Sequence, residues 1–129
     1  MKNGKPAFAL LDDRVPPADP LPKEEALARL AARYFSGHGP ATLQDFIWWS
    51  GLPVGQARQA LASVKGDLHS ETIASATYWF SRRLSVSPSA SDSAYLLPAF
   101  DEFLIGYKDR LASLPRPNHH KAVSSNGIF

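Results

Sequence analysis

Several features that mark common classes of protein are missing from this sequence of 129 residues. There is no cysteine, which excludes a disulfide framework or a thiolate zinc site and fits a reducing cytoplasm. No apolar run approaches the roughly 20 residues that a membrane-spanning helix needs. The basic start of the chain is not followed by the apolar stretch of a signal peptide. We therefore expect a cytoplasmic protein with no membrane partner.

Motifs for catalysis and for metal binding are also missing. No Gly-x-Ser-x-Gly motif occurs, so a nucleophilic triad is not indicated. Gly37 and Gly39 follow no predicted strand, so they do not form a phosphate-binding loop. Asp101 and Glu102 are neighbours that point apart on a helix, and we expect them to cap it or face solvent. Metal-ligand spacing is absent from the four histidines, which are His38, His69, His119 and His120. We expect no metal and no cofactor.

An excess of charge of one sign is missing too. The formal net charge is +2, which tolerates a polyanionic partner without requiring one. Hydrophobic residues make up 44% of the chain and charged residues 20%, which is typical of globular proteins. The length is sufficient for one domain with a single core.

The pattern that is present predicts three helices and a hairpin. Apolar residues recur at helical spacing over residues 23–36, 43–50 and 54–64. Thr42 is a good N-cap for the second helix, with Asp45 three residues later, and Gly51 permits a positive φ in the following turn. Two β-prone stretches, 69–73 and 77–80, predict a hairpin. In the third helix, 54–64, we expect Val54 to be buried on the same face as Ala57, Leu61 and Val64.

This order of elements predicts an α+β fold of the winged helix-turn-helix type, with a three-helix core and a β-hairpin wing. We expect Phe46, Ile47, Leu52, Ala57 and Leu61 to form the shared core. Residues 1–22 are predicted to be an N-terminal strand at Phe8–Leu11 and an extended connector, and 23–83 the winged-helix domain. Residues 84–94 are expected to be a flexible loop, and 95–129 a truncated C-terminal segment with a short helix over 100–107.

The outward side of the third helix is the candidate DNA-binding surface. Glutamine can contact adenine, and arginine can contact guanine or phosphate. Together with the basic end of the hairpin, the candidates are Gln56, Arg58, Gln59, Ser63, Lys65, Arg82 and Arg83. A solvated face explains the same residues, and the same three-helix shape also serves in protein interaction. DNA contact and protein contact therefore both stay open.

A second set of residues is a candidate interface with other domains. Trp48 and Trp49 point about 100° apart on a helix, so both cannot face one core. We expect Trp49 near the core, and Trp48 covered by residues 1–22 or by the C-terminal part, or else exposed as a contact residue. The stretch 108–110 suits phosphate contact or a surface ion-pair cluster. The full set is Trp48, Phe103, Tyr107, Lys108 and Arg110.

Three stretches resemble a known family. They are ALARLAARYF at 26–35, GPATLQDFIWWSGL at 39–52 and LLPAFDEFLIGYKDR at 96–110, with HHK at 119–121 and NGIF at 126–129 as a continuation. Together they resemble the bacterial winged-helix DNA-binding family that includes DNA glycosylases for alkylation damage and interstrand crosslinks. The resemblance implies tandem winged-helix units in a protein roughly three times as long. It therefore predicts that this chain is an internal fragment.

The family's glutamine motif, Gln-apolar-Gln or Gln-apolar-Asp, does not occur here. Gln56 and Gln59 are three residues apart, and Gln44 and Asp45 are adjacent. No catalytic residue is therefore carried over. We expect a non-catalytic DNA-binding module whose partners are double-stranded DNA and the neighbouring winged-helix domains of a longer protein. The alternative is an interdomain winged helix without DNA contact.

Overall fold

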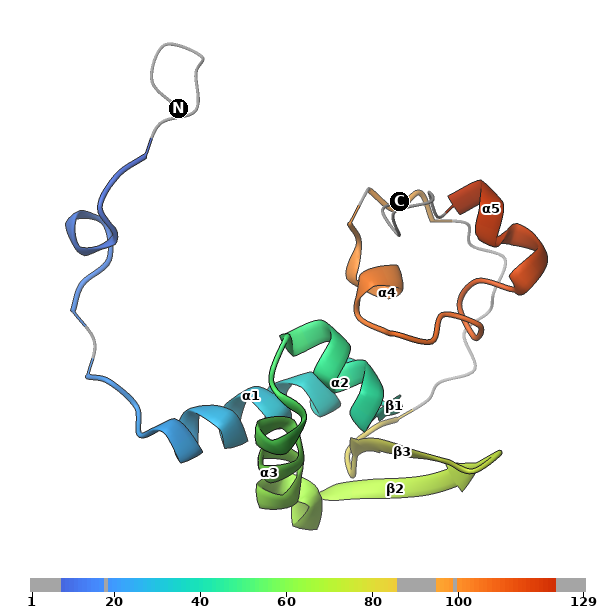
Figure 1. Ribbon diagram of the computed structural model, residues 1–129, viewed down its shortest axis with the longest axis horizontal. Helices are drawn as coiled ribbons and strands as arrows, with labels where there is room; N and C mark the ends of the chain where they lie inside the picture. The colour runs from blue at the N-terminus through green and yellow to red at the C-terminus, as the bar shows by residue number, and fades with distance from the viewer. Residues whose placement is uncertain (1–7, 18, 86–94, 99, 123–129) are drawn as a thin grey trace.

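The computed structural model describes residues 8–17, 19–85, 95–98 and 100–122. The helices are α1 (Lys23–Gly37), α2 (Leu43–Ser50), α3 (Val54–Val64), α4 (Glu102–Ile105) and α5 (His119–Ala122). The strands are β1 (Ala41–Thr42), β2 (Leu68–Ile73) and β3 (Ala76–Ser81), and 3-10 turns lie at Leu11–Asp13, Lys65–Asp67 and Arg116–Asn118. This confirms the α+β class. Figure 1 shows α1, α2 and α3 beside the sheet, an N-terminal arm leading away from them, and the C-terminal segment on the α2 and β1 side.

The first helix, α1, places one apolar face against the rest of the core. Glu24 and Glu25 lie in its first turn, where carboxylates favour the helix dipole. Its buried residues recur at helical spacing and are Leu27, Ala31, Tyr34 and Phe35. The helix extends one residue beyond the predicted end, and the backbone N–H of His38 closes it by donating to the carbonyl of Tyr34 at 2.7 Å.

The second helix, α2, has the bounds that its sequence predicts. The backbone N–H of Asp45 donates to Thr42 Oγ1 at 3.2 Å, and the N–H of Thr42 donates to Asp45 Oδ2 at 2.9 Å. This reciprocal capping box satisfies two N–H groups that a helix start leaves open. Gly51 ends the helix with φ at 66°, as its position in the turn predicted.

The third helix, α3, packs closely on α1 because its inner face carries small side chains. The buried residues are Ala57, Ala60, Leu61 and Val64. Together with Phe46 they belong to the core, and Ile47 and Leu52 pack against it, as predicted. The prediction for Val54 is wrong, because its side chain is 46% exposed. It occupies the first position of α3, where the helix has only just begun to face α1.

The sheet is antiparallel with the strand order β1-β3-β2. The β2–β3 pairing runs from Leu68 opposite Ser81 to Ile73 opposite Ala76. Strand β2 begins one residue before the predicted stretch, and β3 is one residue longer than predicted at each end. Strand β1 was not predicted. Its two residues pair with Trp79 and Tyr78 of β3, which ties the start of α2 to the hairpin.

The N-terminal arm differs from the prediction. Residues 8–17 contain no strand; they form extended chain with one 3-10 turn at Leu11–Asp13. A strand needs a partner for its backbone groups. Residues 8–17 are all exposed, and their backbone runs away from the sheet (Figure 1). The prediction of an edge strand at 8–11 is therefore wrong, while an extended connector agrees with the described residues.

The C-terminal helix is shorter than expected. In place of a helix over 100–107, α4 has four residues, because Phe100 has a φ of 65° and Asp101 is the N-cap, whose carboxylate accepts from the N–H of Phe103 at 2.9 Å. The capping role expected for Asp101 is confirmed. Of the loop predicted at 84–94, residues 86–94 lie outside the described part, as does the stretch 126–129.

Candidate nucleic-acid interface

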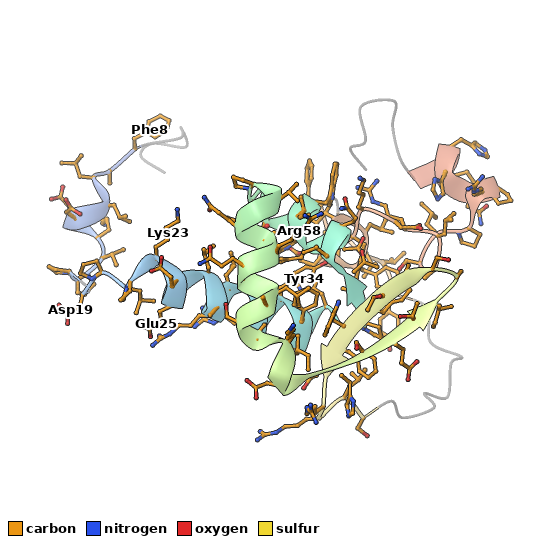
Figure 2. The ribbon with its side chains drawn as sticks, turned by 60° about the horizontal axis from the view of Figure 1, so that its bottom comes forward. Phe8, Asp19, Lys23, Glu25, Tyr34 and Arg58 are labelled. Atoms are coloured by element: carbon orange, nitrogen blue, oxygen red, sulfur yellow. The ribbon has the colours of Figure 1, made fainter. Side chains whose placement is uncertain are left out.

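The outward side of α3 is free of contact with the core. Arg58, Gln59 and Ser63 are exposed and Gln56 is half-buried, while the opposite face of the helix carries the buried residues. Figure 2 shows α3 at the front of the molecule with Arg58 beside it and Tyr34 behind. The Ser63 hydroxyl donates to the carbonyl of Gln59 at 2.8 Å, so it is held by the helix. Arg58 makes no hydrogen bond or ion pair to the described part of the chain.

A second group of basic residues gathers where α3 ends. Lys65 begins the 3-10 turn after α3, and Arg82 Nη2 donates to the carbonyl of Gly66, in the same turn, at 3.0 Å. Arg82 and Arg83 also line a small hollow of about 440 Å³ together with Asp67. Lys65 follows Arg58 by seven residues, so the two lie on the same side of the helix, about 10 Å apart along its axis. The structure thus brings the basic candidates to one side of α3 and to its end.

Trp48 and Phe103 are the two interface candidates with large exposed side chains. Trp48 is 54% exposed and Phe103 52% exposed. The guanidinium carbon of Arg110 lies 5.7 Å from the Trp48 ring centroid, which is cation–π distance. The C-terminal part therefore partly covers Trp48, and Trp49 packs against the core as predicted.

The other three interface candidates hold the C-terminal segment on the helices. Asp45 is buried, and its Oδ1 accepts from the backbone N–H groups of Lys108 at 2.9 Å and Asp109 at 3.2 Å. The Tyr107 hydroxyl donates to the carbonyl of His38 at 2.8 Å, and Arg110 Nε donates to the carbonyl of Leu104 at 2.8 Å. The side chain of Lys108 remains exposed.

A cluster around His38 also joins the C-terminal segment to the helices, and the sequence did not predict it. The His38 ring stacks on Tyr34 with centroids 4.8 Å apart, and Trp49 lies 5.5 Å away. Glu102 Oε2 lies 3.1 Å from His38 Nε2 and accepts from Trp49 Nε1 at 3.0 Å. A Cβ on Gly106 would lie 2.8 Å from the His38 ring, so only glycine fits beside it. The contacts of Glu102 and Gly106 join residues more than 50 positions apart, which no local pattern reveals.

The pKa values of two tyrosine hydroxyls in this cluster are raised. Burial raises the pKa of Tyr34 far above its ordinary value, and the nearby Asp45, Tyr107 and Glu102 raise it further. Burial likewise raises the pKa of Tyr107, again with help from Asp45 and Glu102. Both hydroxyls donate to backbone carbonyls, of Gly106 and His38 respectively, so they act as neutral donors.

Neither a metal centre nor a membrane span is found in the described part of the chain. Within residues 8–17, 19–85, 95–98 and 100–122, no three histidine or carboxylate side chains are grouped closely enough to hold a metal ion. The helices in those ranges are all too short or too polar to cross a membrane.

The family of the chain is shown by comparison with known proteins. The model of a family described as "DNA glycosylase AlkZ-like" matches residues 1–127. The protein is therefore of a DNA-repair-related class whose substrate or partner is DNA. Because the match covers nearly the whole sequence, the chain belongs to the AlkZ-like DNA glycosylase family. Searches among curated proteins and among solved structures gave no match.

Proposed function

We propose that residues 23–83 form a winged helix-turn-helix that holds duplex DNA through α3 and the basic residues at its end. The order of three helices followed by an antiparallel hairpin supports this proposal, in which α2 and α3 would be the helix pair and β2–β3 the wing. The observation that carries the proposal is the outward side of α3, where Arg58 and Gln59 are exposed on a helix whose other face is anchored in the core.

The contacts expected with DNA are mainly with its backbone. Arg58, Lys65 and Arg83 make no ion pair within the described part, so phosphates would not have to displace a carboxylate. Gln56 and Gln59 add hydrogen-bonding capacity toward adenine, and Ser63 lies at the edge of that surface. Four basic contacts, counting Arg82, would hold DNA with little sequence preference.

We propose further that the chain acts without catalysis of its own, inside a longer DNA-repair protein. The family's glutamine motif does not occur in the sequence. In such a protein this unit would position duplex DNA for base excision elsewhere, beside neighbouring winged-helix domains. A cytoplasmic location fits this role.

The test is fluorescence anisotropy with a labelled duplex of about 20 base pairs at 50 and 200 mM salt. Four phosphate contacts predict a slope of about −3.6 in log affinity against log salt, so affinity falls roughly 150-fold between the two salts. Arg58→Ala or Lys65→Ala is expected to reduce the slope by about 1.

The matched control is Arg29→Ala. Arg29 is exposed on α1 and pairs with Glu25, away from α3. This variant is expected to bind like the unaltered protein. Absence of duplex binding at 50 mM salt, or an equal loss in Arg29→Ala and Arg58→Ala, would contradict the proposal.

A second candidate function is an interdomain winged helix without DNA contact. It is favoured by the exposed aromatic rings of Trp48 and Phe103, which lie outside the α3 surface. In this case neighbouring winged-helix domains would cover Trp48, Phe103 and the segment that carries Tyr107, Lys108 and Arg110. Self-association in sedimentation that Trp48→Ala abolishes, together with no DNA binding, would favour this function over the first.

A further inference from the structure

A groove lies on a different part of the molecule from the outward side of α3. It has a volume of about 1520 Å³. Its walls are the hairpin turn with the first part of β3 (75–79), the start of α2, and residues 107–116 of the C-terminal segment. The seven DNA-contact candidates of α3 and the hairpin end do not line it. Pockets for small molecules have volumes of about 300–1,000 Å³, so this groove is large enough for a chain of several units.

The charges in the groove favour an anionic occupant. Lys108 and Arg116 line it with exposed side chains that make no ion pair or hydrogen bond to the described part of the chain. Arg110 lines it as well, although its Nε is held by the carbonyl of Leu104. An anion that binds in the groove can therefore pair with Lys108 and Arg116 without displacing a carboxylate from either side chain.

The carboxylates in the groove are already engaged by the protein. Asp45 accepts four hydrogen bonds: from the N–H and hydroxyl of Thr42 at Oδ2, and from the N–H groups of Lys108 and Asp109 at Oδ1. Asp109 Oδ1 accepts from the N–H of Leu111 at 2.9 Å. These bonds occupy carboxylate oxygens but leave the two negative charges in place, so the attraction for an anion comes from the excess of cations: Lys108, Arg110 and Arg116 line the groove against Asp45 and Asp109.

Aromatic side chains line the same groove as these cations. Tyr78 and Trp79 both line the groove from β3, and Trp79 also packs against the core. The side chain of Tyr78 is half-exposed, so part of it is open to a ligand in the groove. Glu71 lies opposite Tyr78 on β2 and brings a negative charge to that edge of the groove.

We infer that this groove binds an unpaired stretch of DNA, with phosphates at Lys108 and Arg116 and a base stacked on Tyr78. Grooves that combine cations with aromatic rings are the usual sites for single-stranded nucleic acid, because every base offers a flat face. The inference rests on the proposed function and extends it: α3 holds the duplex, and the groove receives a strand that has left it.

The test compares a labelled ten-nucleotide oligothymidine with the 20-base-pair duplex at 50 mM salt, using the full chain. Lys108→Ala and Arg116→Ala are each expected to weaken oligothymidine binding about fivefold to tenfold, and Tyr78→Val by at least fivefold. Glu71→Gln is expected to strengthen it, because it removes a negative charge beside the stacking ring. Duplex affinity should stay within twofold in all four variants.

Two control variants separate the groove from α3 and from general charge. Arg58→Ala is expected to weaken duplex binding and to leave oligothymidine binding unchanged. Lys23→Ala removes an exposed lysine at the start of α1, which does not line the groove, and should change neither affinity. Thermal melting of each variant establishes whether it is folded. If Tyr78→Val does not fold, Lys108→Ala still provides the test, because Lys108 bonds to Asp45 only through its backbone N–H and its side chain can be removed without loss of that bond.

Three results would overturn the inference. The first is no oligothymidine binding by the unaltered protein. The second is binding that falls in Arg58→Ala but not in the groove variants, which would place the strand on α3. The third is equal displacement of oligothymidine by polyglutamate, which would show that the groove responds to charge alone. Duplex binding measured in parallel decides the proposed function separately.

Discussion

At the scale of single residues, Asp45 joins two parts of the chain that are distant in sequence. One carboxylate oxygen caps α2 through Thr42, and the other accepts from the backbone of Lys108 and Asp109. Its side chain is buried, so water cannot replace these partners. The capping role was evident from the sequence, whereas the second role requires the fold.

Asp45→Asn is expected to lower the free energy of unfolding by about 2–3 kcal/mol. An asparagine has one oxygen, so its NH₂ group must face either the donors of Thr42 or those of the C-terminal segment. The measurement is urea unfolding followed by circular dichroism. Asp67→Asn, an exposed carboxylate in the turn after α3, is the control and should change stability by less than about 0.5 kcal/mol. Equal stabilities of the two variants would contradict the role assigned to Asp45.

Gly106→Ala is expected to loosen the C-terminal segment. Its Cβ would lie 2.6 Å from the carbonyl oxygen of Glu102 and 2.8 Å from the His38 ring, and the ring is stacked against Tyr34. We expect a loss of about 1–3 kcal/mol and faster proteolysis after residue 95. Gly55→Ala is the control, because nothing lies within 4 Å of its Cβ and alanine favours a helix. It should leave stability unchanged or raise it.

The raised pKa values of Tyr34 and Tyr107 predict a loss of stability in alkali. Unfolded tyrosine loses its proton near pH 10, whereas the folded state keeps it. The unfolded state therefore binds fewer protons above pH 10, and stability falls as pH rises beyond that value. Melting temperatures between pH 8 and 11 measure this fall. Tyr34→Phe should be less stable at pH 8 and should show a shallower decline, and a decline as steep as in the unaltered protein would exclude Tyr34 as its source.

At the scale of elements, the hairpin turn carries strain that a single substitution can relieve. Ala74 and Ser75 connect β2 to β3 with φ values of 48° and 68°. Two central residues with positive φ define a type I′ turn, which favours asparagine and glycine. The turn thus has the geometry that the strand twist needs, without the residues that adopt it most easily.

Ser75→Gly is expected to stabilise the protein by about 1 kcal/mol, because glycine adopts a positive φ without a steric penalty. Thermal melting should show a rise of a few degrees. Ser70→Gly makes the same chemical change within β2, where glycine weakens a strand, and should lower the melting temperature. A fall in both variants would mean that the turn is not strained.

The elements also show how much of the fold the sequence could predict. The bounds of α2 and α3 and the existence of the hairpin follow from Thr42, Gly51 and the apolar spacing, because capping and periodicity are local. Strand β1 was missed because two residues carry no periodicity and Thr42 was already explained as a cap. The contact between His38 and Glu102 was missed because 64 residues separate them. The groove formed by the C-terminal segment depends on such contacts and could not be predicted either.

At the scale of the whole molecule, the two ends of the described chain differ in their contribution to stability. In the arm, Phe8 is 101% exposed and its neighbours Leu10 and Leu11 are 72% and 71% exposed. Figures 1 and 2 show this arm leading away from the helices and sheet. The C-terminal segment, by contrast, is bonded to the core through Tyr107 and through the backbone of Lys108.

Removal of residues 2–20 is therefore expected to leave the free energy of unfolding unchanged, since none of the large apolar side chains in the described part of the arm is buried. Removal of 95–129 should destabilise the protein by several kcal/mol, because it leaves Oδ1 of Asp45 and the Tyr34 hydroxyl without their partners in the C-terminal segment. Urea unfolding of both shortened chains measures the difference. The shorter N-terminus should also reduce aggregation, because exposed apolar side chains promote association. Equal destabilisation by the two deletions would show that the arm packs on the folded unit in solution.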